Sequence, residues 1–140
     1  MSYTTQTTTL QDVGRVVLAT FMVGAGTGHL TFARRAFQAQ VPDWVPMDKD
    51  IVVLLSGVVE IGLGLSLLLA KKRRVPMGLG LATFYGMVFP GNVHQYTHHI
   101  SAFGLDSDGK RLARLFFQPV LMGWALWSTG ALKALRQPAQ

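Results

Sequence analysis

The stretch IVVLLSGVVEIGLGLSLLLA, residues 51–70, decides how this 140-residue chain folds. It contains no Asp, Lys or Arg, and its single charged residue is Glu60. The hydrocarbon core of a bilayer is about 30 Å thick, and a helix needs about 20 largely apolar residues to cross it. The stretch therefore predicts a transmembrane helix over about residues 50–70, with one carboxyl group near its middle.

Three further stretches contain no charged residue: 16–33, 75–105 and 115–132. Charged residues make up only 14% of the chain, against about 25% in an average soluble domain. A soluble bundle would also need polar residues every two or three positions along one face of each helix, and these stretches lack them. We therefore expect an all-α fold, an integral membrane four-helix bundle forming a single domain over residues 1–140.

The expected helices cover about residues 12–30, 50–70, 75–94 and 111–135, and they follow a polar tail, residues 1–11. Pro90 should kink or stop the third helix, and Pro119 should bend the fourth unless that helix restarts there. Between the first two helices, two prolines flank Trp44, and aromatic side chains suit the membrane–water boundary. This segment predicts a short interfacial helix followed by a rigid turn.

Basic residues indicate the orientation. The densest patch is KKRR, residues 71–74, and placing it in the cytoplasm makes both termini cytoplasmic (N-in/C-in). We expect a multi-pass protein of the cell membrane, which is the inner membrane in a bacterium. The net charge of +6 lies at membrane edges without a basic groove, so the expected partner is the lipid bilayer rather than nucleic acid. The chain has no cysteine, which excludes thiolate catalysis and Cys-ligated clusters by this chain.

Glu60 is the first candidate for chemistry. A charge at the bilayer centre costs about 2.5–3.5 kcal/mol on insertion scales, and such side chains usually face the bundle interior. Counting residues inward from the helix ends places Tyr85 and Trp124 at a similar depth. We therefore expect Glu60 to accept a hydrogen bond from the Tyr85 hydroxyl, the Trp124 indole, or both. Glu60 either holds helices together or forms a proton or ligand site.

Histidines gather at one membrane side in this topology. His29 ends the first helix, and three more follow the third helix. His94 and His98 are four residues apart, a spacing that puts two imidazoles on one helical face. The spacing places no third ligand, so we expect no metal site.

Two amides, Asn92 and Gln118, lie near the same ends of helices three and four. They either cap the helices or bond backbone groups freed by Pro90 or Pro119, or they surround a small outward-facing pocket above Glu60. The candidate ligand-binding set is therefore Glu60, Tyr85, Asn92, His94, Gln118, Trp124 and His29.

Four segments together resemble the DoxX-like family of small four-helix membrane proteins over about residues 13–132. They are GTGHLTFARRAFQAQVPDWVP (26–46), SGVVEIGLGLSLLL (56–69), FYGMVFPGNVHQY (84–96) and RLFFQPVLMGWALW (114–127). The family's usual Pro-Ala-Asn is Pro-Gly-Asn here. The resemblance implies that the recurrent positions are His29, Pro42, Pro46, Glu60, Pro90, Asn92 and Gln118.

Members of that family have no common chemistry. Some are subunits of thiosulfate:quinone oxidoreductase or other membrane oxidoreductases, some accompany methylamine dehydrogenase maturation, and one vertebrate relative resembles a receptor-assembly chaperone. The resemblance implies an accessory or assembly subunit, or a binder of a small apolar ligand around Glu60. The alternatives are a quinone-linked oxidoreductase subunit and a small proton-coupled carrier. The chain has no catalytic motif of its own. A quinone remains a possible cofactor, and another membrane protein or a redox subunit remains a possible partner.

Overall fold

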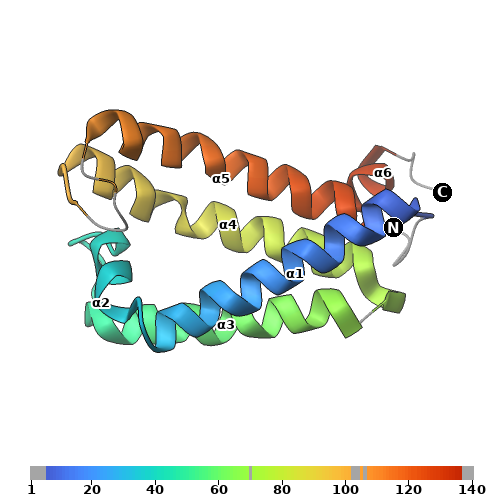
Figure 1. Ribbon diagram of the computed structural model, residues 1–140, viewed down its shortest axis with the longest axis horizontal. Helices are drawn as coiled ribbons and strands as arrows, with labels where there is room; N and C mark the ends of the chain where they lie inside the picture. Colours follow the sequence, from blue (N-terminus) through green and yellow to red (C-terminus); the bar gives the residue numbers. More distant parts are fainter. Residues whose placement is uncertain (1–5, 70, 102–104, 106, 137–140) are drawn as a thin grey trace.

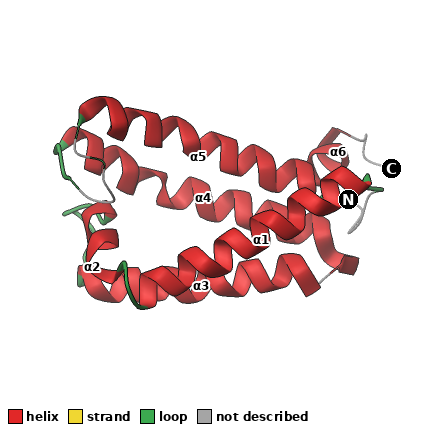
Figure 2. Cartoon of the chain, in the orientation of Figure 1, coloured by secondary structure: helices red, strands yellow, loops and turns green. Residues whose placement is uncertain are grey.

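The computed structural model of the chain describes residues 6–69, 71–101, 105 and 107–136, and every element assigned within them is a helix (Figure 2). The all-α expectation is confirmed for these residues. Four helices are long: α1 (Thr9–Leu30), α3 (Lys49–Leu69), α4 (Arg74–Thr97) and α5 (Asp108–Ser128). The short ones are α2 (Arg34–Phe37), η1 (Gln38–Gln40), η2 (Lys71–Arg73) and α6 (Ala131–Arg136).

The long helices lie side by side as two antiparallel pairs (Figure 1). α1 packs mainly on α3, and α4 packs mainly on α5. The start of α1, α6 and η2 lie at one end of the molecule, and α2 lies at the other (Figure 1). A buried apolar core joins the two pairs and consists of Leu18, Ala19, Met22, Leu67, Leu81, Tyr85, Leu121 and Ala125.

Two of the described helices, α1 and α3, are long and apolar enough to cross a membrane by their length and composition. They are the two that pack most closely on one another. The short helical segment expected between them is present as α2 and η1, at the end of the molecule opposite the chain termini.

The buried side of α3 is a single stripe with alternating spacings of three and four residues. Its members are Val53, Gly57, Glu60, Gly64 and Leu67. The two glycines let the α1 backbone approach closely, because a Cβ on Gly57 would lie 2.6 Å from His29 Cβ and one on Gly64 would lie 3.0 Å from Ala19 O. Glu60 lies between these glycines on the stripe, so it is carried into the interior rather than toward the surroundings.

Pro90 and Pro119 each lie inside a continuous helix, so the alternative that Pro90 stops the third helix is wrong. α4 continues through Pro90 to Thr97, and α5 continues through Pro119. The expected helix 111–135 instead ends at Ser128 and restarts as α6. Gly130 has a φ of 76°, a left-handed conformation that glycine adopts without steric cost, and this residue forms the break.

The first helix begins at Thr9, earlier than expected. Thr8 and Gln11 form a capping box, in which the Gln11 amide N–H donates to Thr8 Oγ1 and the Thr8 N–H donates to Gln11 Oε1. Residues 9–11 of the expected polar tail are therefore helical. Residues 1–5 of that tail lie outside the described part of the chain.

Candidate ligand pocket

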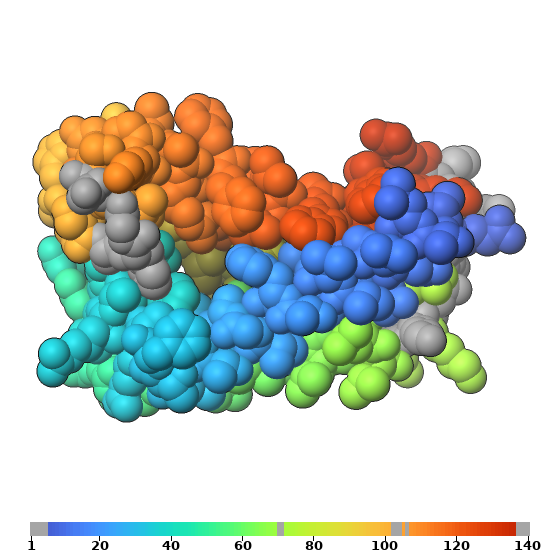
Figure 3. All heavy atoms as spheres, viewed as in Figure 1, coloured from blue at the N-terminus to red at the C-terminus, as the bar shows by residue number. Residues whose placement is uncertain are grey.

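A cavity of about 590 Å³ lies between the two helix pairs, on the α2 side of the core. All four long helices contribute to it, together with η1 and the turn that follows. Figure 3 shows the molecule hollowed between the paler blue end of α1 and the orange α5, with α4 at the base. Core residues Tyr85 and Leu121 close the cavity toward the chain termini.

The cavity wall is mainly apolar and aromatic, with a small number of polar side chains. The apolar wall includes Phe21, Phe32, Phe37, Trp44, Val52, Val53, Phe84, Val88, Phe117 and Leu121. The polar side chains are His29, Gln40, Ser56, Glu60, Tyr85, Asn92, Arg114 and Gln118. This size and composition are typical of small-molecule sites, which occupy about 300–1,000 Å³.

Glu60 is 5% exposed and contacts His29 across the α1–α3 interface. The Glu60 Oε2 atom lies 3.4 Å from His29 Nδ1. The same nitrogen lies 2.8 Å from the Ala25 carbonyl oxygen, and the His29 ring stacks on Phe37 at 3.5 Å between centroids. Backbone, carboxylate and aromatic ring together hold the imidazole in place beside the cavity.

Gln118 joins α5 to α4 by hydrogen bonds at both ends of its amide. Its Nε2 donates to the Tyr85 carbonyl oxygen at 2.8 Å, and its Oε1 accepts from Asn92 Nδ2 at 3.3 Å. Tyr85 O lies in the turn before Pro90, next to the Gly86 carbonyl that the proline leaves without its helical N–H partner. Among the described hydrogen bonds, neither amide bonds a carbonyl freed by a proline, so that sequence-based alternative is not confirmed. Both amides do line the pocket.

Arg114 is a pocket residue that the sequence analysis did not single out. Its NH1 donates to Gln118 Oε1 at 3.0 Å, and its guanidinium lies 5.5 Å from the centre of the Phe117 ring. Arg114 lies four residues before Gln118, and this spacing, which puts both side chains on one face of the helix, could have identified it. Near a helix end, however, a basic side chain is usually interfacial, so the sequence alone favoured a role in topology.

Two polar atoms at the pocket are buried without a hydrogen-bond partner among the described residues. They are the Tyr85 hydroxyl and Asn92 Oδ1. The hydroxyl can donate or accept, whereas the amide oxygen can only accept. Buried polar atoms are almost always paired, so both atoms favour a site that a polar group of a ligand completes.

The expected pairing of Glu60 with Tyr85 or Trp124 is wrong in this structure. The Tyr85 hydroxyl has no described partner, and Trp124 Nε1 donates to the Gly14 carbonyl oxygen at 2.9 Å. Trp124 is part of the α1–α5 contact near the chain termini, because the close passage of α1 there offers an acceptor. Of the seven predicted site residues, the structure brings five to the cavity: His29, Glu60, Tyr85, Asn92 and Gln118. His94 lies farther along α4, near Asp43.

Comparison with protein-family models shows a match over residues 18–129 to the family described as Domain of unknown function (DUF8561). The chain belongs to this family. The matched region includes every residue of the cavity wall. No curated protein and no solved structure matches the chain.

Proposed function

We propose that the protein is a multi-pass membrane protein whose four long helices form a membrane bundle around a binding pocket. Large apolar side chains are exposed on all four helices, which suits contact with lipid and not with water. They include Val13, Val16, Val17 and Phe21 on α1, Ile51, Leu55, Val58, Val59 and Leu65 on α3, Met87 on α4, and Phe116, Phe117 and Val120 on α5.

The polarity of α4 and α5 fits this proposal. α4 contains Asn92, His94 and Gln95, which lower its average hydropathy, yet all three side chains are buried in the protein. Gln118 and Ser128 of α5 are buried in the same way. In a membrane bundle, polar side chains face the interior, so the composition of these helices understates how apolar their outer surface is.

An N-in/C-in orientation is part of the same proposal. Lys72 and Arg73 of η2 lie at the end of the molecule that holds the start of α1 and α6. Lys133 and Arg136 of α6 add two more basic residues there. By the positive-inside rule, this end faces the cytoplasm and the pocket lies toward the opposite side.

The activity that the geometry supports best is binding of a small, largely apolar molecule with a polar end. The observation that carries this proposal is the apolar cavity in which the Tyr85 hydroxyl and Asn92 Oδ1 are left unpaired. After a small side-chain shift that opens either atom to the cavity, a ligand hydroxyl could donate to Asn92 Oδ1, and a ligand oxygen could accept from the Tyr85 hydroxyl. The aromatic wall would hold the apolar remainder.

A quinone or quinol is a second, narrower candidate for the ligand. A quinol hydroxyl has the donor that Asn92 Oδ1 lacks, and a quinone carbonyl can accept from Tyr85 or Arg114. This candidate agrees with the DoxX-like resemblance, which we retain as a proposal along with the accessory or assembly role and the proton-coupled carrier. Because this chain has no cysteine, a redox role would use a bound quinone or a partner and not a thiolate of this chain.

Native mass spectrometry of the protein in mild detergent tests ligand binding, with two matched variants on α3. Ser56 lines the cavity, whereas Ser66 does not, and each donates to the carbonyl four residues earlier in the helix. We expect a bound small molecule, or an added short-tailed benzoquinone, on the wild type and Ser66→Phe. Binding to Ser56→Phe should be at least about tenfold weaker, equal to about 1.4 kcal/mol. Equal binding to the two variants, or none to the wild type, would overturn the proposal.

A further inference from the structure

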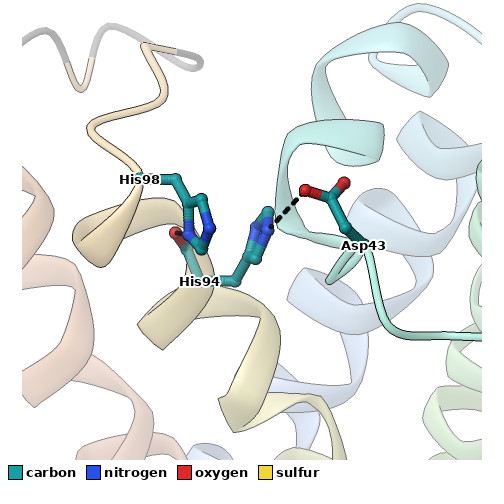
Figure 4. Close-up of side chains that lie close together, drawn as sticks. All are labelled: Asp43, His94 and His98. Carbon is teal, nitrogen blue, oxygen red and sulfur yellow. Dashed lines mark hydrogen bonds and ion pairs between the residues drawn. The ribbon is translucent and has the colours of Figure 1, made fainter.

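Outside the pocket, three potential metal ligands converge at the far end of α4 (Figure 4). His94 lies in the last turn of this helix, His98 is the C-cap residue four positions later, and Asp43 comes from the turn after η1. One ligand atom from each residue lies within 4.8 Å of the other two. The Asp43 Oδ2 atom lies 3.5 Å from His94 Nε2. The third ligand that the spacing of the histidines could not supply therefore comes from another part of the chain.

His94 is buried, and its imidazole is incompletely paired. Its residue is 6% exposed, and Nδ1 has no hydrogen-bond partner among the described residues. Nε2 faces the Asp43 carboxylate at 3.5 Å, which is longer than an ordinary hydrogen bond. Its ring stacks on that of His98 at 4.0 Å between centroids, which satisfies no nitrogen lone pair. An unpaired buried polar group calls for an explanation, and a bound ion is one of the few available.

His98 is oriented as a metal-binding histidine usually is. Its Nδ1 lies 3.1 Å from the His94 carbonyl oxygen, so a hydrogen on Nδ1 donates to that carbonyl. The other ring nitrogen, Nε2, then carries the free lone pair. Metal-ligating histidines almost always donate their second N–H to a carbonyl or carboxylate in this way.

Asp43 is held in place by a neighbour. Lys49 Nζ donates to Asp43 Oδ1 at 2.6 Å. Oδ2 remains directed at His94. The lysine therefore fixes which of the two carboxylate oxygens faces the histidines.

We infer that Asp43, His94 and His98 bind one divalent transition-metal ion of the Zn²⁺ type. Two imidazoles and a carboxylate suit zinc, and three protein ligands leave a fourth position for water or another group. The ligand atoms must close to about 3.4 Å, their spacing on a tetrahedron with bonds of about 2.0–2.1 Å. Asp43 and His98 are exposed and can rotate toward the buried His94.

The ion would tie the turn after η1 to α4. Val41, Pro42 and Trp44 of that turn line the ligand pocket, so the ion would also brace one of its walls. The inference does not rest on the proposed ligand, because the three side chains and their distances are independent of what the pocket holds.

Titration of the full chain with metal tests this inference. The protein is prepared in mild detergent without a polyhistidine tag, stripped with chelator, and titrated with ZnCl₂ by calorimetry and with Co²⁺ by visible absorption. His98→Gln and Asp43→Asn remove exposed ligands and leave the buried His94 in place. His99→Gln is the matched control, since His99 is the adjacent imidazole and bonds Asp108 at 2.7 Å instead.

We expect one Zn²⁺ per wild-type chain and a Co²⁺ spectrum of a low-coordinate nitrogen–oxygen site. His98→Gln and Asp43→Asn should each weaken binding by at least about tenfold, the least that loss of even an outer-shell partner usually costs. His99→Gln should bind like the wild type. The inference fails if the wild type shows no saturable one-to-one binding, if neither ligand variant weakens it, or if His99→Gln weakens it equally.

Discussion

The carboxylate of Glu60 lies 3.4 Å from Nδ1 of His29, and this contact joins α3 to α1 beside the pocket. Gly57, one turn before Glu60, makes the contact feasible because its missing side chain lets the two helices approach. Glu60 in the apolar helix α3 and His29 at the end of α1 are thus partners where the two helices cross at Gly57.

A double-mutant cycle should reveal this partnership. We expect His29→Ala and Glu60→Ala to be coupled by about 0.5 kcal/mol or more, because residues in direct contact are generally non-additive. The measurement is the free energy of unfolding of the single and double variants in detergent. Strict additivity would mean that the two side chains are neighbours without an energetic interaction.

The α1–α3 crossing predicts opposite effects of the same substitution at two glycines of α3. In Gly57→Ala the new Cβ meets His29 and the Gly26 carbonyl, so we expect a loss of about 1–3 kcal/mol from overpacking. The control is Gly62→Ala, whose Cβ meets nothing within 4 Å. That change should be neutral or stabilise by up to about 1 kcal/mol, since alanine favours helix. If Gly57→Ala and Gly62→Ala changed the thermal unfolding temperature equally, the close approach of α1 to α3 at Gly57 would be contradicted.

Much of the fold follows from charge-free runs, because a long apolar run bounded by charges has few alternatives to a helix. Polar residues inside those runs also identified five of the eight polar side chains that line the pocket. Glu60, Asn92 and Gln118 stand out in apolar surroundings, and inward-facing polar side chains of separate helices converge on the same interior space. Counting residues along helices placed Tyr85 at the right depth for the cavity.

Helix rotation and long-range contacts were beyond the sequence. Gly24 and Gly28 have the spacing of a packing face, yet a Cβ on Gly24 would meet nothing, and Gly26 makes the contact with α3. Which face of α1 turns inward depends on its partner helix. Asp43 is far from His94 in sequence, and only the turn after η1 brings the carboxylate to the histidines.

Tyr85→Phe should leave stability unchanged and weaken ligand binding. The Tyr85 hydroxyl is already buried without a described partner, so deleting it breaks no hydrogen bond within the protein. We expect a change in unfolding free energy within about 0.5 kcal/mol. Thermal unfolding in detergent and the native mass spectrum measure the two effects. A loss of more than about 1 kcal/mol would show that the hydroxyl has a partner, as the sequence-based pairing with Glu60 requires.

Gln118→Leu should be strongly destabilising. Loss of the amide leaves Asn92 Nδ2 and the Tyr85 carbonyl oxygen without their partner, which costs about 1–3 kcal/mol for a buried polar group. Adding Asn92→Leu should recover part of this loss, since removing both partners is less costly than leaving one unpaired. Denaturant unfolding of the single and double variants provides the comparison. If the double variant lost as much unfolding free energy as the two single variants together, the hydrogen bond between Asn92 and Gln118 would be contradicted.

Lysine substitutions at two exposed apolar positions of α3 test the membrane assignment. Val58 lies near the middle of the helix and Leu69 at its end, beside the basic residues of η2. In a bilayer, Val58→Lys should cost about 2.5–3.5 kcal/mol on insertion scales, whereas Leu69→Lys can extend its charge to the interface. We expect Val58→Lys to reduce the amount of protein recovered in alkaline-washed membranes and Leu69→Lys to leave it unchanged. If both variants accumulate equally, or the wild type stays monodisperse in water without any amphiphile, lipid is not the medium around this helix.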